Sequence, residues 1–141
     1  MKKSLFEAKE SRAHYYAKVE VKKWIETDPE LIGLTDIVKI IEEDQFCWNG
    51  FVCFVSDLGV YDKSGIIKFI EIRKTHEVDN NKILKMANYC IAHGWYGLEM
   101  IEISAEWVLN QCVHPEKIEV LNRVLISKPI DNEDLTNNLE F

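Results

Sequence analysis

The feature that most constrains the fold is a pair of β-rich segments separated by a short turn. GFVCFVSDLGVYD (50–62) and GIIKFIEIRK (65–74) are both rich in β-branched and aromatic residues. The turn between them is centred on residues 63–65 and contains a glycine, which is typical of a hairpin connection. The two segments therefore predict a β-hairpin.

The register of this hairpin decides whether two acidic side chains meet. With a three-residue loop and Gly65 in the left-handed conformation, Asp57 faces Glu71, whereas a two-residue loop shifts the pairing by one residue. Side chains alternate along a strand, so Asp57, Glu71 and Arg73 are expected on one face and the intervening isoleucines on the other. Two acids directly across a ladder repel each other unless positive charge lies between them.

The acidic pair has two interpretations. A strand that is apolar on both faces is usually covered on both, and a carboxylate there needs a cation or hydrogen-bond donors. Mg²⁺ meets this need, because it binds one or two carboxylates together with water and phosphate oxygens. The alternative is that Glu71 and Arg73 lie on an exposed face of a half-buried strand or pair with neighbours. The residues alone leave both interpretations open.

The other segments predict an α/β protein in which helices and strands surround the hairpin. The expected elements are, in order, a helix at 5–26, a strand or short helix at 36–43, the hairpin, a helix at 80–93, a strand at 98–104 and a short helix at 105–111. The apolar stripe of the first helix is expected to contain Ala13, Ala17, Val21 and Trp24. Gly94 and Ser104 fit a helix C-terminus and a helix N-cap, respectively. The part after residue 111 carries no clear signal.

Length and charge favour one cytoplasmic domain. The chain has 141 residues, which predicts a single domain at 1–130 followed by an acidic tail at 131–141. A charged N-terminus and four cysteines favour an intracellular protein with reduced thiols, and no apolar run is long enough for a membrane span. The net charge is −7, but residues 1–23 carry seven basic and three acidic side chains, so a basic region lies beside an acidic body.

Three stretches carry a resemblance to a known family. They are ESRAHYYAK in the first helix, SDLGVYD on the first arm of the hairpin and IEIRKTH on the second, and together they give the pattern D-x(13)-E-x-R. Over residues 7–104 the chain resembles the PD-(D/E)xK nuclease superfamily. It is most similar to the competence CoiA-like branch, whose opening helix often reads E-S-x-x-H-x-x-x-K. The resemblance implies an αβββαβ restriction-endonuclease-like core with a mixed central sheet, Mg²⁺ or Mn²⁺ as cofactor, and DNA as substrate.

The resemblance also implies roles for individual residues. The expected metal ligands are Asp57, Glu71, the backbone carbonyl of Ile72 and Glu10; the expected catalytic residues are Asp57, Glu71, Arg73 and Lys18; and the expected substrate contacts are His14, Lys74, Thr75 and His76. Arg73 stands where the motif has a lysine, and an arginine stays protonated, so it can stabilise charge but cannot accept a proton. Lys18 or Lys82 could supply the missing ammonium from a helix.

Helical spacing gives independent support for the first helix. Glu10, His14, Lys18 and Lys22 are four residues apart and form one polar stripe. The stripe either packs beside the hairpin, where it could reach a metal and a phosphate, or is a solvated face with weak ion pairs.

Three further hypotheses compete with a nuclease. A zinc site could use Cys90, His93, Cys112 and His114, although both cysteines also fit small buried hydrophobic residues. The same fold could be a catalytically degenerate module that binds nucleic acid or protein. The acidic tail could bind a protein partner, and a homodimer is possible. Cys47 and Cys53, which flank Trp48 and Phe51, are interpreted as core residues.

Overall fold

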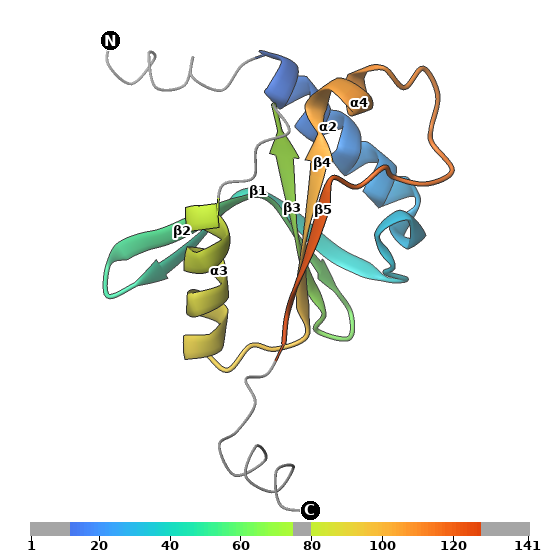
Figure 1. Ribbon diagram of the computed structural model, residues 1–141. Helices are drawn as coiled ribbons and strands as arrows, with labels where there is room; N and C mark the ends of the chain where they lie inside the picture. The colour runs from blue at the N-terminus through green and yellow to red at the C-terminus, as the bar shows by residue number, and fades with distance from the viewer. Residues whose placement is uncertain (1–11, 75–79, 128–141) are drawn as a thin grey trace, which may run out of the picture.

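The computed structural model describes residues 12–74 and 80–127, and these form a mixed five-stranded sheet flanked by helices (Figure 1). The elements are α2 (Arg12–Thr27), η1 (Pro29–Ile32), β1 (Ile37–Trp48), β2 (Phe51–Asp62), β3 (Ile67–Arg73), α3 (Asn80–Ala92), β4 (Leu98–Ser104), α4 (Ala105–Leu109) and β5 (Asn122–Ile126). The α/β class with a mixed central sheet between helices is therefore confirmed. The expected positions Glu10, Thr75 and His76, and the acidic tail, lie outside the described residues.

The strands lie in sequence order, β1-β2-β3-β4-β5. The pairs β1–β2, β2–β3 and β4–β5 are antiparallel, and β3–β4 is parallel. A parallel pair needs a crossover connection, and α3 provides it. The elements from α2 to β4 thus follow the order helix, three strands, helix, strand.

The hairpin turn forms as its sequence predicts. The Asp62 N–H donates to the Ile66 carbonyl at 3.0 Å, and Gly65 has a φ of 91°, in the left-handed region. The Asp62 side chain also accepts hydrogen bonds from the backbone N–H groups of Ser64 and Ile66. Leu58 consequently pairs with Ile70, which is the register of the three-residue loop.

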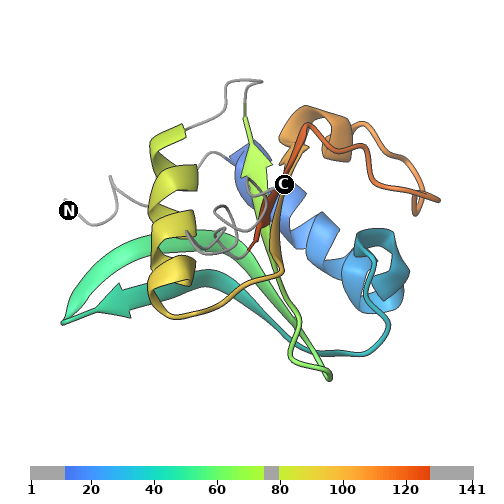
Figure 2. The same ribbon diagram turned by 60° about the horizontal axis from the view of Figure 1, so that its bottom comes forward.

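β1 settles the ambiguous segment at 36–43 as a strand and extends it to Trp48. β1 and β2 turn at Asn49 and Gly50, which both have positive φ, as a tight two-residue hairpin requires. The far half of this hairpin extends beyond the rest of the sheet as an arm beside α3 (Figures 1 and 2). We refer to residues 44–57 as the hairpin arm.

The hairpin arm corrects one expectation from the sequence. Cys47 is exposed and so does not lie in the core as predicted, whereas Cys53 is half-buried and packs against the core under α3. Trp48 and Phe51, near the tip, have exposed fractions of 53% and 76%. The arm projects from the sheet, so the residues near its tip have no layer above them on one side.

Two apolar cores cover the two faces of the sheet. One lies under α2 and α4 and contains Val21, Ile25 and Ile70; the other lies under α3 and contains Phe69 and Met86. Neighbouring residues of β3 therefore enter different cores, as alternation along a strand requires. The predicted apolar stripe of α2 is buried except for Ala13, which is exposed.

In the part of the chain after β3, local sequence signals predict the ends of α3 and α4 but not the last strand. The Ser104 hydroxyl caps α4 by accepting from the Trp107 N–H at 3.3 Å, and Gly94, with a φ of 69°, follows the end of α3, as expected. β5 was not predicted; it is short and joins the free edge of β4 after a loop. No helix within the described ranges is long and apolar enough to span a bilayer.

Candidate metal and phosphodiester site

The site lies where β2 and β3 separate. Their main-chain pairing ends at Leu58 and Ile70, and the next residues on the two strands are Asp57 and Glu71. Side chains continue the hydrogen bonding there: the Ile72 N–H donates to Asp57 Oδ2 at 2.8 Å, and the Asp57 N–H donates to Glu71 Oε2 at 2.9 Å. We call this position the fork. The predicted meeting of the two acids is confirmed in register and in contact.

Glu71 is the buried member of the pair. Its exposed fraction is 2%. Burial, and then the negative charge of Asp57, raise the pKa of Glu71 to about 7. Lys82 of α3 opposes this shift, because its ammonium forms an ion pair with Glu71. A carboxylate with this pKa is half protonated near neutral pH, which is typical of functional sites.

Asp57 is held in the charged form. Burial alone would raise its pKa, but hydrogen bonds from His14 and the Ile72 N–H, together with the charges of His14 and Lys82, keep the pKa below its ordinary value. His14 Nε2 lies 3.2 Å from Asp57 Oδ2 and 3.0 Å from the Ile72 carbonyl oxygen. Both partners accept hydrogen bonds, so Nε2 carries the proton and donates. The fork thus contains one ionised carboxylate and one whose charge changes near neutral pH.

The polar stripe of α2 packs against the sheet. His14 reaches the fork, the Lys18 ammonium donates to Glu43 Oε1 at 2.5 Å, and Lys22 donates to Glu42 Oε2 at 3.1 Å. The interpretation as a solvated face is therefore wrong for His14 and Lys18, whereas Lys22 forms the exposed ion pair that it expected. Lys18 has an exposed fraction of only 2%, and its ion pair directs it toward β1.

Glu43 is a neighbour of the fork that the sequence did not reveal. It lies between the pairs Glu42–Leu58 and Asp44–Ser56, so it stands opposite Asp57 across the β1–β2 ladder. Its φ of 50° is in the left-handed region, which non-glycine residues rarely adopt and which often marks functional positions. An acidic residue in a strand with a polar face gives no signal of this conformation.

Arg73 makes a contact that the sequence did not predict. Its Nη2 donates to Glu102 Oε1 at 3.3 Å, so part of the guanidinium faces β4. Glu102 is fully buried and lies beside Glu71 in the parallel register of β3 and β4. Arg73 Nε and Glu102 Oε2 are buried without a hydrogen-bond partner among the described residues. Glu102 could have been found from the sequence, because like Glu71 it is a carboxylate within an apolar, buried strand and therefore needs a partner.

The donor set of the fork fits a hard divalent ion. Asp57, Glu71 and the Ile72 carbonyl offer only oxygen, the donor that Mg²⁺ and Mn²⁺ prefer, and two carboxylates are enough for an ion that completes its shell with water and phosphate oxygens. Within residues 12–74 and 80–127, no three His, Cys, Asp or Glu side chains converge as metal ligands. Lys74 follows β3 and is exposed.

The structure contradicts the zinc hypothesis, because the four predicted ligands do not converge. Cys90 is buried in the core under α3, and burial raises the pKa of its thiol to about 11. His93 stacks on Tyr89 at 4.1 Å, whereas His114 lies 3.5 Å from Asp28 on the side of α2. All four predicted ligands are described, and they do not form a metal group.

Comparison of the chain with family models, with curated proteins and with solved structures gave no match.

Proposed function

We propose that the chain is a metal-dependent nuclease that hydrolyses phosphodiester bonds of DNA at the fork. The observation that carries this proposal is the pair Asp57 and Glu71, which lie in contact where two strands separate. Burial raises the pKa of Glu71 most, and repulsion by the charge of Asp57 raises it further, to about 7. A divalent cation would relieve this repulsion.

Asp57, Glu71 and the Ile72 carbonyl would hold the ion. When bound, Mg²⁺ or Mn²⁺ would polarise the scissile phosphate and lower the pKa of a coordinated water. His14 donates to two of these three oxygen groups, so its imidazole would orient them or turn to a phosphate oxygen. The resemblance to the PD-(D/E)xK superfamily agrees with these assignments and remains a prediction.

Lys82 is the better candidate for the ammonium that the motif lysine would supply. Its ion pair with Glu71 places it at the fork, and 27% of its side chain is exposed to incoming substrate. Lys18 pairs with Glu43 on β1, and Arg73 contacts Glu102 on β4. Lys82 can donate to a phosphate oxygen or to a water, and its charge would stabilise negative charge as the phosphodiester bond breaks.

A catalytically degenerate module that binds nucleic acid or protein is the second candidate. The observation that favours it is that protein groups already satisfy both carboxylates. His14 and the Ile72 N–H serve Asp57, while Lys82 and the Asp57 N–H serve Glu71. Such a fork would be stable without a cation.

A cleavage assay separates the two candidates. The protein is incubated with single-stranded, duplex and branched DNA in the presence of Mg²⁺, Mn²⁺ or EDTA, alongside Asp57→Asn, Glu71→Gln and Lys82→Ala. An exposed acid away from the fork provides the matched control Glu116→Gln. The nuclease predicts metal-dependent cleavage that Asp57→Asn and Glu71→Gln abolish and the control retains. Binding of DNA without cleavage by any metal-loaded sample would favour the module, and cleavage that survives both fork variants would locate the activity elsewhere.

A further inference from the structure

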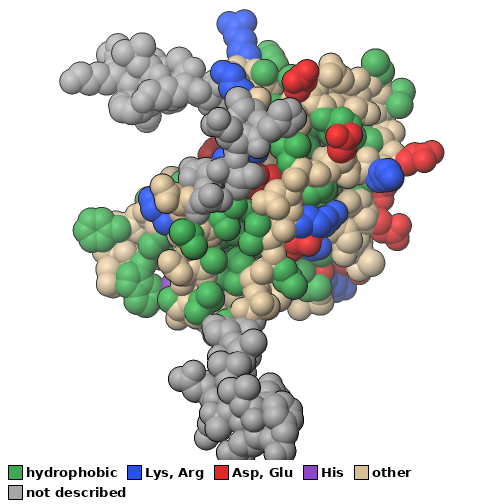
Figure 3. Space-filling model, viewed as in Figure 1, with side chains coloured by type: hydrophobic (Ala, Val, Ile, Leu, Met, Phe, Trp, Pro, Cys, Tyr) green, Lys and Arg blue, Asp and Glu red, His purple; other side chains and the backbone are tan. Residues whose placement is uncertain are grey.

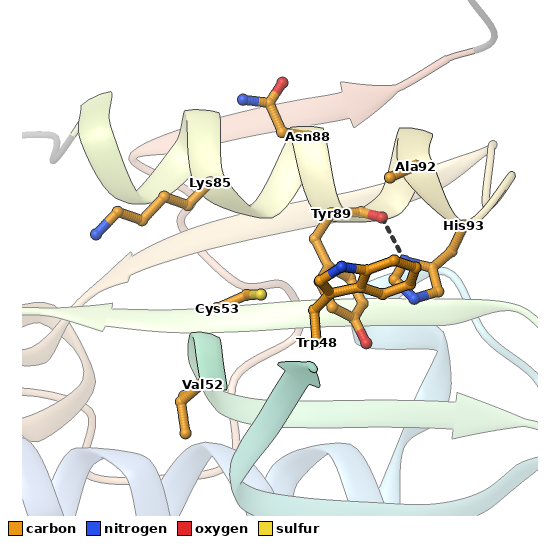
Figure 4. A pocket seen from close by; sticks show the side chains of 8 residues that line it. All are labelled: Trp48, Val52, Cys53, Lys85, Asn88, Tyr89, Ala92 and His93. Carbon is orange, nitrogen blue, oxygen red and sulfur yellow. Dashed lines mark hydrogen bonds between the residues drawn. The ribbon is translucent and has the colours of Figure 1, made fainter. Parts of the chain in front are cut away.

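A cavity between α3 and the hairpin arm lies outside the fork. Its volume is about 470 Å³, and its wall contains Trp48 and Val52 of the hairpin arm together with Tyr89 of α3 and His93, which directly follows α3 (Figure 4). Tyr89 stacks on His93 at 4.1 Å, and Trp48 meets the His93 ring edge-to-face at 4.9 Å. The Tyr89 hydroxyl donates to the Cys47 carbonyl at 3.0 Å and so fixes the hairpin arm to α3. We call this cavity the aromatic cavity.

A second cavity, of about 260 Å³, adjoins the aromatic cavity on the side of the fork. It shares Cys53 and Lys85 with the aromatic cavity and is also lined by Lys82, the partner of Glu71. The two cavities therefore lie side by side along α3 and β2, and we call them together the path. From Val52 to Asp57 an extended strand covers about 16 Å, which is long enough for a few linked residues of a polymeric ligand.

The described lining of this path lacks acidic residues, although the chain as a whole is acidic. The net charge is −7, yet neither cavity is lined by any aspartate or glutamate among the described residues. Lys82 and Lys85 line it one helical turn apart. Figure 4 shows Lys85 at one end of the aromatic cavity and the three rings at the other. An acid-free path with lysines at one end and exposed rings at the other fits a ligand that alternates phosphate groups with flat bases.

We propose that this path binds a single-stranded segment of nucleic acid, with a base stacked in the aromatic cavity and the adjoining backbone led past Lys85 to the fork. Trp48 is 53% exposed, and hydrophobic side chains gather around the arm tip on this side of the molecule (Figure 3). A duplex keeps its bases stacked inside, so it cannot place one there without unpairing. The role of the strand as substrate rests on the proposed function, whereas its binding does not require cleavage.

Fluorescence anisotropy in EDTA tests the binding alone, with labelled single-stranded DNA, single-stranded RNA and duplex DNA. Trp48→Ala is expected to weaken single-strand binding about tenfold, and Trp48→Tyr to restore most of it, because any aromatic ring can stack. Phe51→Ala is the matched control, since Phe51 is more exposed but lines neither cavity. Lys85→Ala is expected to lower the slope of log affinity against log salt by about 0.7, and exposed Lys23→Ala to leave it unchanged.

Three results would overturn the proposal. They are duplex binding as tight as single-strand binding, equal effects of Trp48→Ala and Phe51→Ala, or no binding of any nucleic acid. Sedimentation of the same variants tests whether a second copy of the chain occupies the aromatic cavity instead. If Trp48→Ala and Phe51→Ala both lose a dimer while nucleic-acid binding is unchanged, the aromatic residues form a contact between copies of the chain. Because EDTA prevents metal-dependent cleavage, a failed nuclease assay leaves this result unchanged, and a failed binding assay leaves the fork variants informative. If the variants weaken the binding of single-stranded DNA and single-stranded RNA equally, the proposal is supported and the path does not distinguish deoxyribose from ribose.

Discussion

Replacing Glu71 by glutamine tests whether the ionised carboxylate of Glu71 lowers the free energy of unfolding. Burial and the charge of Asp57 raise the pKa of Glu71 from 4.5 to about 7, so the folded chain binds this proton more tightly than the unfolded chain. Protonated Glu71 therefore contributes stability that is fully present below about pH 4.5 and is lost as the pH rises to about 7. Glutamine has nearly the same shape and does not ionise, so the variant should lack this loss.

The size of the effect follows from the two pKa values. The interval from 4.5 to about 7 corresponds to about 3 kcal/mol, at about 1.4 kcal/mol per pH unit. The charge of Lys82 already lowers this pKa, so the ion pair that the variant loses is included in the interval. We expect Glu71→Gln to be about 3 kcal/mol more stable than the parent chain at about pH 8, and within about 1 kcal/mol of it at about pH 5.

Urea unfolding followed by tryptophan fluorescence measures this difference. Both proteins are unfolded in EDTA at about pH 5 and about pH 8, and the free energies of unfolding are compared. Glu116→Gln, which removes an exposed carboxylate, is the control and should follow the parent chain at both pH values. If the parent and Glu71→Gln lose stability in parallel between the two pH values, Glu71 titrates as an ordinary glutamate and the electrostatic description of the fork is wrong.

Three other perturbations test separate parts of the structure. In Gly59→Ala the new Cβ would overlap the Asp44 carboxylate, so we expect a loss of about 1–3 kcal/mol in urea unfolding; unchanged stability would contradict the close packing of β1 on β2. Ser104→Ala removes the cap of α4 and should lower stability by about 1 kcal/mol, visible as a lower melting temperature, and an unchanged melting temperature would argue against the cap. Mg²⁺ should raise the melting temperature more at about pH 8 than at about pH 5, because a proton on Glu71 competes with the ion, and should have no effect on Asp57→Asn; an equal rise in that variant would place the ion elsewhere.

The hairpin and its register could be predicted because local chemistry determines them. Asp62 and Gly65 specify the three-residue turn, and strict alternation then carries the register from the turn to the fork. Asp57 and Glu71 could thus be brought together from sequence alone. The class of most elements between residues 12 and 109 could be predicted for the same reason; the exceptions are η1, which was not predicted, and the apolar run at 36–43, which fitted both a strand and a helix.

The partners of the acids could not be predicted in the same way. His14 and Lys82 reach the fork only because α2 and α3 pack on opposite faces of the sheet, and that arrangement depends on contacts between distant segments. The contact of Arg73 with Glu102 depends on which strand lies beside β3, which local patterns do not reveal. The exposure of Cys47 was missed because alternation describes the faces of a strand and not where the sheet ends.

The hydrogen bonds at the fork show why its charge matters. Asp57 and Glu71 each accept one backbone N–H, and these two bonds replace the ladder where β2 and β3 part. Asparagine and glutamine could accept the same two bonds through their carbonyl oxygens without the repulsion that raises the pKa of Glu71. The negative charge of Glu71 is therefore not needed to close the sheet, and in the folded chain it reduces stability. What two adjacent anionic oxygens can do and two amides cannot is bind a divalent cation tightly. The expected gain in stability of Glu71→Gln and its expected loss of any response to Mg²⁺ should accordingly occur together, because both arise from removal of the same charge.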